Sequence, residues 1–214
     1  MILYGLPTSP YSRKVMAFAS QKGIALESCA QKLDWPAGAF DPAFLACSPF
    51  KKVPALRDGD FAIADSSAIV AYLDALHPLP NLIPLEPRSR ARVIWFEEYA
   101  DTLVAPVVSR IFANRVFFKR FLGREGDQAA ALKAEREELP PLLDYLEAEL
   151  PAAGFLVDER LTLADIAVIS SLANLRHHEF ALDRWPKAAS YSKRMLALPC
   201  FAGGIAKERA LFAA

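Results

Sequence analysis

The sequence has few cysteines, no long hydrophobic run and no excess charge of either sign. The three cysteines, Cys29, Cys47 and Cys200, are not at the short spacing of metal-binding pairs. We expect three reduced, mostly buried thiols and no bound metal. No uncharged run reaches the roughly 18 residues of a membrane-spanning helix, and the N-terminus lacks the pattern of a secretory signal. These absences predict a cytoplasmic protein that does not enter a membrane.

The charges of the chain balance. Lys and Arg together number 25, and so do Asp and Glu. Binding to a phosphate backbone needs a basic excess, so a nucleic-acid partner is not expected. Hydrophobic residues make up 53% and charged residues 23%, which is typical of a folded globular chain.

A proline-rich segment divides the chain. Residues 78–87 read PLPNLIPLEP, and prolines at this density do not fit a helix interior or a central strand. Strand-like and helical runs alternate before this segment, whereas every periodic run after it is helical. We therefore predict a domain of residues 1–78, a linker of residues 79–86 and an all-helical domain of residues 87–214.

The first domain is predicted to form a mixed four-stranded sheet with helices on its faces. Pro10 suits a first helical turn, Gly23 suits a helix end, and Asp58-Gly59-Asp60 predicts a hairpin turn. A helix that joins two strands favours a parallel pair, and the hairpin must be antiparallel. The expected strands are residues 2–4, 25–31, 53–57 and 61–64, and the expected helices are residues 10–22 and 65–77.

The second domain is predicted to be a bundle of about five helices. Pro106 should bend the first of them, and Pro140-Pro141 should kink or split the second. The expected helices are residues 88–121, 127–150, 162–175, 185–198 and 200–212.

The junction between the first strand and the first helix could carry chemistry. Residues 8–15 read TSPYSRKV. A helix start offers unpaired N–H groups and a partial positive charge, so a hydroxyl there faces a pocket that favours anions. Ser9 precedes Pro10 and is the natural N-cap. Taken alone, Ser9 needs no role beyond capping.

Two further segments can likewise be explained either by local structure alone or by contact with a ligand. Pro54, in KVPAL, could form either an ordinary trans bond at a strand edge or a cis bond that turns the Val53 backbone toward a ligand. Asp65 and Ser66 open a helix, where an acid is stabilised by the helix dipole with or without a ligand.

Four segments occur together in a characteristic order. They read TSPYSRKV, SPFKKVPAL, DSSAIVAYL and, at residues 155–168, FLVDERLTLADIAV, where Thr162 and Asp165 form a variant capping box. The ordered set closely resembles the glutathione S-transferase superfamily, in its cytosolic, bacterial-like, serine-type form. The resemblance covers nearly the whole chain. It implies a thioredoxin-like N-terminal domain that binds glutathione, and an all-α domain that lines the site of the second substrate.

The resemblance also implies site residues. Ser9 takes the place of the catalytic hydroxyl, and the Val53 backbone takes the place of the group that pairs with the cysteinyl part of glutathione, held by a cis Pro54. Asp65 and Ser66 stand where the γ-glutamyl end is bound.

Lys52 stands at the position where, in the family, a basic or amide side chain binds the glycyl carboxylate of glutathione. Two positions depart from the family pattern. Asp65 is one methylene shorter than the more usual Glu, so its contact with glutathione could be weaker or mediated by water. Lys51 stands where glycine is common, so Lys51 and Lys52 could exchange roles.

The predicted chemistry is activation of a thiol. A free thiol has a pKa near 8.5, and the thiolate is the nucleophile. We expect Ser9 to donate a hydrogen bond to the sulfur of glutathione, which then attacks a small hydrophobic electrophile. Ser12, Tyr4 and Tyr11 are rival hydroxyls. Ser9 and Ser12 occupy the two positions of a C-x-x-C pair, and since both lack sulfur, dithiol exchange is excluded there.

Two other functions stay open. Ser9-Pro10-Tyr11-Ser12-Arg13-Lys14-Val15 loosely fits an S-x-x-S-x-[RK]-V element of one class of the family, which implies a glutathione-dependent isomerase. Several members of the family act instead as stress-response or regulatory glutathione-binding proteins with little turnover. The resemblance implies a homodimer in every case.

Overall fold

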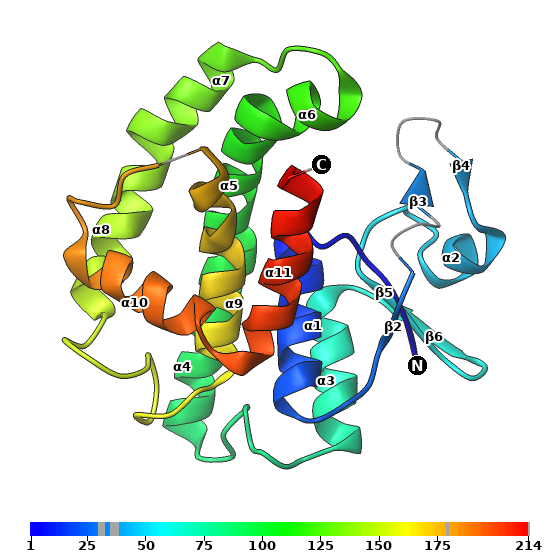
Figure 1. The fold of residues 1–214 in the computed structure, drawn as a ribbon. Coiled ribbons are helices and arrows are strands. Elements are labelled where there is room, and N and C mark those ends of the chain that lie inside the picture. The colour runs from blue at the N-terminus through cyan, green and yellow to red at the C-terminus, as the bar shows by residue number, and fades with distance from the viewer. Residues whose placement is uncertain (30–32, 35–38, 179, 214) are drawn as a thin grey trace. The chain divides into compact units, whose positions relative to one another are not determined.

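The computed structural model describes residues 1–29, 33–34, 39–178 and 180–213, in two compact units (Figure 1). The first unit consists of Met1–Leu82 and Leu198–Ala214, and the second of Ile83–Ala197. The change of unit after Leu82 falls within the segment predicted as a linker. The C-terminal helix, which we expected in the helical domain, is grouped with the first unit.

The first unit is built on a mixed sheet of four strands. Their order across the sheet is β2 (Glu27–Ser28), β1 (Ile2–Tyr4), β5 (Ala55–Asp58) and β6 (Phe61–Ala64). The β1 and β2 strands are parallel, and the other neighbouring pairs are antiparallel. The predicted mixed four-stranded sheet is confirmed.

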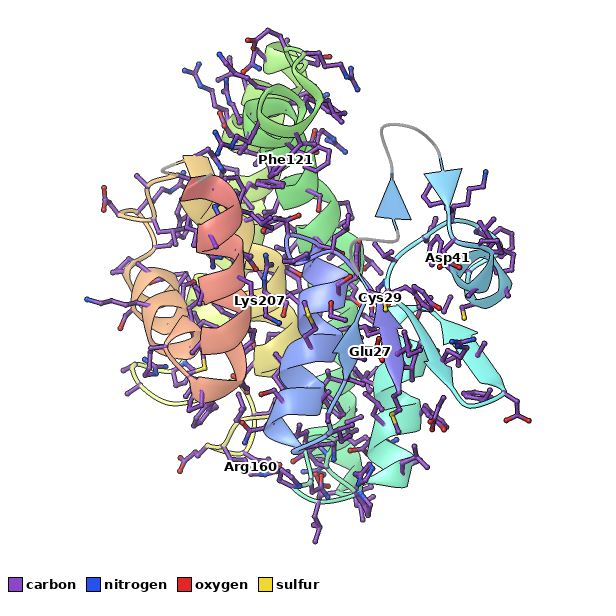
Figure 2. The ribbon with its side chains drawn as sticks, turned by 45° about the vertical axis from the view of Figure 1, so that its right-hand side comes forward. Glu27, Cys29, Asp41, Phe121, Arg160 and Lys207 are labelled. Atoms are coloured by element: carbon purple, nitrogen blue, oxygen red, sulfur yellow. The ribbon has the colours of Figure 1, made fainter. Side chains whose placement is uncertain are left out.

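The edge strand β2 is shorter than predicted. Pairing with β1 continues at Cys29, whose N–H donates to the Leu3 carbonyl over 2.9 Å. Glu27 and Cys29 are labelled in Figure 2. We expected this strand over residues 25–31, and its last two residues lie outside the described part of the chain.

Helices cover both faces of this sheet (Figure 1). On one face Tyr4 packs on Phe44 of α2 (Pro42–Cys47), with ring centroids 5.7 Å apart. On the other face Leu3 lies toward α1 (Pro10–Gln21), which packs against α3 (Ser66–Leu76) and α11 (Pro199–Ala213). A separate antiparallel pair, β3 (Leu33–Asp34) and β4 (Ala39–Phe40), was not predicted, and neither was α2.

A buried lysine fastens the end of α1 to the end of α3. The Lys22 ammonium is fully buried and donates to the His77 carbonyl over 2.6 Å and to the Pro80 carbonyl over 2.8 Å. It also lies 2.8 Å from the Asp74 carboxylate. A cation at a helix C-terminus satisfies carbonyls that lack partners within the helix, so Lys22 stabilises this corner of the unit.

All regular secondary structure in the described residues of the second unit is helical. Its α-helices are α4 (Pro87–Glu98), α5 (Ala105–Phe112), α6 (Phe118–Leu122), α7 (Gln128–Lys133), α8 (Leu139–Glu149), α9 (Leu163–Leu172) and α10 (Pro186–Leu196). Wider π-helical segments, Tyr99–Val104, Ala113–Phe117 and Ala134–Glu138, join α4 to α5, α5 to α6 and α7 to α8. A 3₁₀ segment, Ala173–His178, follows α9.

The π-helical turns explain how the long helices contain proline. Pro106 and Pro140 are each the second residue of the α-helix that follows such a segment, α5 and α8 respectively. The Ala105 N–H bonds to the Ala100 carbonyl, five residues back, and the Leu139 N–H bonds likewise to Ala134. A wide turn removes the crowding that a proline ring causes in a regular helix. Helical hydrogen bonding therefore continues past each proline, but the regular α-helix is interrupted just before it, next to the positions where we predicted a bend and a kink or split.

The core of the second unit is α9, in which every residue is buried. The predicted Thr162–Asp165 capping box is present at its start. Asp165 is fully buried and also accepts hydrogen bonds from the Leu156 N–H and the Tyr191 hydroxyl, each over 2.9 Å. Burial raises the pKa of the Asp165 carboxyl, while these hydrogen bonds oppose the rise.

In the described part of the chain, no helix combines the length and the apolar character needed to cross a lipid bilayer.

Candidate active site

The register of the sheet brings three predicted site segments to one end of it. Tyr4, the last residue of β1, lies opposite Ala55, the first residue of β5, and Ala55 lies opposite Ala64, the last residue of β6. The loop from β1 to Ser9 therefore starts at the same end of the sheet as Val53-Pro54, which precede β5, and Asp65, which follows β6. The three segments are distant in sequence and adjacent in the fold.

Ser9 begins the first helix. It has an extended backbone, and its hydroxyl accepts a hydrogen bond from the Ser12 N–H over 3.3 Å. The Ser9 N–H donates to the Leu6 carbonyl over 3.0 Å, which closes the turn after β1. The Ser9 side chain is half-buried. Capping is confirmed, and it leaves the hydroxyl proton of Ser9 available to another acceptor.

Two of the rival hydroxyls lie in the interior. Ser12 is fully buried, and its Oγ has no hydrogen-bond partner within the described residues. It packs against Gly5, where an added Cβ would lie 2.9 Å from Ser12 Oγ. Tyr4 is fully buried in the cluster that contains Phe44. Neither hydroxyl is exposed to a ligand, whereas Tyr11 is half-buried like Ser9.

The segment before β5 is held by Ser48. The buried Ser48 hydroxyl donates to the Lys52 carbonyl over 2.7 Å and accepts from the Lys52 N–H over 3.0 Å. The Val53–Pro54 bond is cis, as the resemblance implied. Lys51 has a φ of 56°, in the left-handed region that favours glycine, which explains why glycine suits this position. The side chains of Lys51 and Lys52 are both exposed.

Asp65 caps the N-terminus of α3 and has an unusual backbone conformation. Its carboxylate accepts from the Ser67 N–H over 2.9 Å and from the Ala68 N–H over 3.0 Å, and its side chain is exposed. Its φ of 83° lies where a residue with a Cβ is strained, by about 1–3 kcal/mol. Ser66, the next residue, is buried. The strained backbone presents the carboxylate at the end of the sheet beside the start of α3.

Lys14 is a further candidate that the sequence analysis did not select. It lies in α1, is fully buried, and donates from its ammonium to the Ser67 hydroxyl over 3.1 Å. It thereby places a positive charge at the first turn of α3, next to Asp65 and Ser66. Its place in the S-x-x-S-x-[RK]-V element was the available signal, but only the fold shows that it reaches α3.

The cysteines do not form a reactive centre. Cys29, Cys47 and Cys200 are buried and form no disulfide with one another. Burial raises the pKa of the Cys47 thiol, partly offset by Arg57, and raises that of Cys200 to about 11. Within the described residues, no group of three or more His, Cys, Asp or Glu side chains could hold a metal ion.

The fold and the clustered segments define a two-part protein: a thioredoxin-like unit with a candidate site at one end of its sheet, followed by a helical unit. Residues 3–81 match the family model of the glutathione S-transferase N-terminal domain, and residues 99–199 match that of the C-terminal domain. The chain belongs to the glutathione S-transferase family.

Individual relatives agree with this assignment. The chain is 30% identical to glutathione S-transferase 3 of Zea mays, over 81% of this chain and 78% of the relative. It is 27% identical to the maleylacetoacetate isomerase of Rattus norvegicus, over 94% of this chain and 89% of that relative. The structure of glutathione S-transferase III in its apo form is similar with a TM-score of 0.80 at 28% identity, over 96% of this chain and 95% of that one.

Proposed function

We propose that the protein is a glutathione transferase in which Ser9 holds the glutathione sulfur as a thiolate for attack on a small hydrophobic electrophile. The observation that carries this proposal is the strand register that aligns Tyr4, Ala55 and Ala64. Because of it, the N-cap hydroxyl, the Val53 backbone and the Asp65 carboxylate surround one end of the sheet.

The free energies are adequate for this role. Lowering a thiol pKa from about 8.5 by two units requires about 2.7 kcal/mol. A hydrogen bond to a charged group contributes about 1.5–3 kcal/mol, and a helix N-terminus contributes about 0.3–1 kcal/mol more. Ser9 supplies the first and α1 supplies the second. The burial of Ser12 and Tyr4 further favours Ser9 as the donor.

The remaining contacts follow from the residues around Ser9. The Val53 backbone pairs with the cysteinyl amide groups, and Lys52, or its neighbour Lys51, meets the glycyl carboxylate. Asp65 accepts from the γ-glutamyl ammonium, and Ser66 holds the adjacent carboxylate. Lys14 holds Ser67 and so fixes the first turn of α3 beneath that end of the ligand.

Conjugation is tested by following the thiol of glutathione against a panel of aryl halides. Ser9→Ala should reduce turnover strongly, whereas Ser20→Ala, which changes an exposed serine of the same helix, should not. Equal turnover of Ser9→Ala and the unchanged protein would contradict the role of Ser9. Binding of glutathione without conjugation of any halide would favour a non-catalytic glutathione-binding protein.

A second candidate is a glutathione-dependent isomerase. It is favoured by the relative named maleylacetoacetate isomerase and by the S-x-x-S-x-K-V spacing that ends at Lys14 and Val15. An isomerase returns glutathione after each turnover, whereas a transferase consumes it. Thiol titration during turnover of a cis-diketo acid separates the two reactions.

We also propose that the protein acts as a homodimer in the cytoplasm. The support is its family membership, and equilibrium sedimentation of the full chain tests the dimer.

A further inference from the structure

The loop that leads from β1 to Ser9 is held in part by a side chain of the helix that follows it. Pro7 and Pro10 flank Ser9, and neither has a backbone N–H to donate. The Ser9 N–H bonds to the Leu6 carbonyl over 3.0 Å. The carbonyl of Pro7, two residues before Ser9, accepts a hydrogen bond from Arg13 Nη2 over 3.4 Å. Arg13 therefore reaches back from α1 to the loop that carries Ser9.

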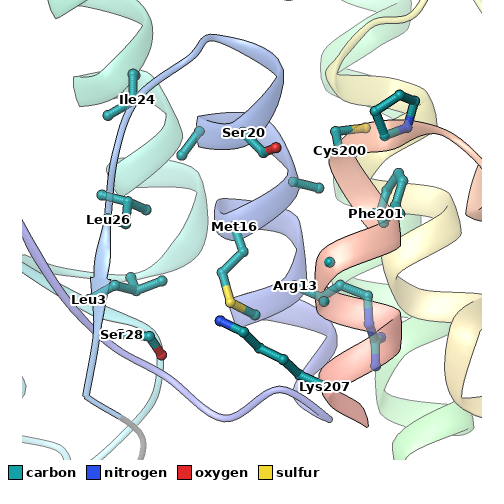
Figure 3. A pocket seen from close by; sticks show the side chains of 15 residues that line it. Leu3, Arg13, Met16, Ser20, Ile24, Leu26, Ser28, Cys200, Phe201 and Lys207 are labelled. Carbon is teal, nitrogen blue, oxygen red and sulfur yellow. The ribbon is translucent and has the colours of Figure 1, made fainter. Parts of the chain in front are cut away.

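The same guanidinium is held from another side by the last helix of the chain. Arg13 Nε donates to Glu208 Oε1 over 2.8 Å, and the two side chains are only 3% and 1% exposed. Arg13 extends from α1 to α11 along one side of the pocket between these helices (Figure 3). The loop, α1 and α11 all belong to the first unit. One side chain thus joins the C-terminal helix to the loop of the candidate active site.

The two hydrogen bonds of Arg13 depend on each other. A guanidinium is planar, and its N–H groups point in fixed directions. When Nε is held by Glu208, the direction of Nη2 is fixed as well. The bond to the Pro7 carbonyl is long, and such a bond weakens steeply when its donor turns away. The bond to Glu208 is buried and charge-assisted, so it is the stronger of the two and sets the geometry of the weaker.

We propose that Arg13 and Glu208 are positioning residues of the active site, which hold the loop after β1 so that the Ser9 hydroxyl can donate to the glutathione sulfur. This inference rests on the proposed role of Ser9 as that donor. Arg13 and Glu208 act through the Pro7 carbonyl and need no contact with glutathione. A misplacement of about 1 Å can cost a reaction about 100-fold in rate, so a contact that fixes the Ser9 loop has a measurable effect.

Arg13→Lys separates the two contacts of the guanidinium. Lysine retains a positive charge for Glu208, but its single ammonium lacks the fixed fork that reaches the Pro7 carbonyl at the same time. We expect the pKa of the bound glutathione thiol to rise by about 0.5–1 unit and kcat/KM to fall by about threefold to tenfold, with a smaller change in the KM for glutathione. Because the charge is retained, loss of a nearby cation does not explain such a shift.

Arg115→Lys is the matched control. Arg115 donates to Glu135 from Nε over 2.8 Å and from Nη2 over 2.6 Å, in the second unit. Both variants should lose stability toward urea, but only Arg13→Lys should raise the pKa of the bound thiol. The same thiol pKa in Arg13→Lys, Arg115→Lys and the unchanged protein would show that the Arg13 pair serves the fold alone, and would overturn the proposal.

A combination with Ser9→Ala tests whether Arg13 acts through Ser9. Without the hydroxyl there is no donor to position, so Arg13→Lys should not shift the thiol pKa further in Ser9→Ala protein. Equal shifts in the two backgrounds would refute the proposal. A shift in Ser9→Ala without one in Arg13→Lys overturns this inference alone, whereas no shift in Ser9→Ala overturns the proposed function as well.

Glu208→Gln tests the contribution of α11 and does not depend on the folding of Arg13→Lys. Glutamine retains an oxygen that accepts from Arg13 Nε but lacks the charge that holds the guanidinium. The thiol pKa should rise in the same direction as in Arg13→Lys, while bound glutathione shows that the variant is folded. An unchanged thiol pKa in Glu208→Gln would remove α11 from the positioning of Ser9.

Discussion

Arg13 Nε lies 2.8 Å from Glu208 Oε1, and both side chains are almost fully buried. The pair joins α1 to α11 across 195 positions of sequence. It gives a physical reason for the grouping of the C-terminal helix with the first unit. A helix that ends the chain is thereby held against the helix that Ser9 begins.

Breaking this pair should destabilise the protein strongly. In Glu208→Ala the Arg13 guanidinium loses a buried partner, and we expect the free energy of unfolding to fall by about 3–5 kcal/mol. Urea denaturation measures the change. Glu149→Ala breaks the more exposed Arg92–Glu149 pair, at 2.6 Å, and should lower stability by no more than about 1 kcal/mol. Similar losses in the two variants would show that burial does not strengthen the Arg13 pair.

Replacing Lys14 should affect glutathione binding more than it affects folding. In Lys14→Met the Ser67 hydroxyl loses the ammonium that holds it, so the first turn of α3 is less well fixed. We expect the KM for glutathione to rise by about tenfold, the equivalent of about 1.4 kcal/mol, which is close to the lower end for a hydrogen bond to a charged group. Lys14→Arg retains the charge and should recover part of the loss. An unchanged KM in Lys14→Met, at unchanged kcat, would remove Lys14 from the site.

His178 should make stability depend on pH. Burial lowers its pKa below the usual value of about 6.5, although the nearby Glu135 carboxylate opposes the shift and Arg115 and His177 add to it. As pH falls below about 6.5, the unfolded chain takes up a proton at His178 before the folded chain does, so stability decreases.

The test is the urea midpoint between about pH 7.5 and about pH 5.5. His178→Gln should flatten the decrease toward low pH, whereas His77→Gln, which changes an exposed histidine, should not. A decrease of the same size in His178→Gln and in the unchanged protein would assign the dependence to other groups.

Asp65→Asn separates the capping role of this residue from its proposed role in binding. Asparagine is an equally good N-cap and tolerates a positive φ, so thermal unfolding should shift little. It lacks the negative charge for the γ-glutamyl ammonium, so glutathione affinity should fall by about tenfold or more. A variant that is unstable yet binds glutathione normally would reverse this assignment.

Much of the first unit could be predicted from local signals. Pro10, Gly23 and the Asp58-Gly59-Asp60 turn act on the neighbouring backbone alone, and the elements they predict are present. The cap of Ser9 and the capping box of Asp165 are equally local. In each case the residue type satisfies backbone groups only a few positions away.

The features that the sequence did not predict depend on contacts between residues distant in sequence. Lys14 reads as an exposed helical lysine until α3 is packed beside α1. Ser12 packs against Gly5, seven positions earlier, and α11 is joined to α1 by the buried pair of Arg13 and Glu208. Periodicity shows that a helix has an apolar face, but it does not show which element covers that face.

The ionisation of bound glutathione tests the central claim most directly. The ultraviolet absorbance of the thiolate, followed against pH at saturating protein, gives the pKa of the bound thiol. With Ser9 present we expect that pKa about two units below the free value of about 8.5, and in Ser9→Ala we expect it to rise by about one to two units. The same thiol pKa in both proteins, with glutathione bound in each, would contradict the account.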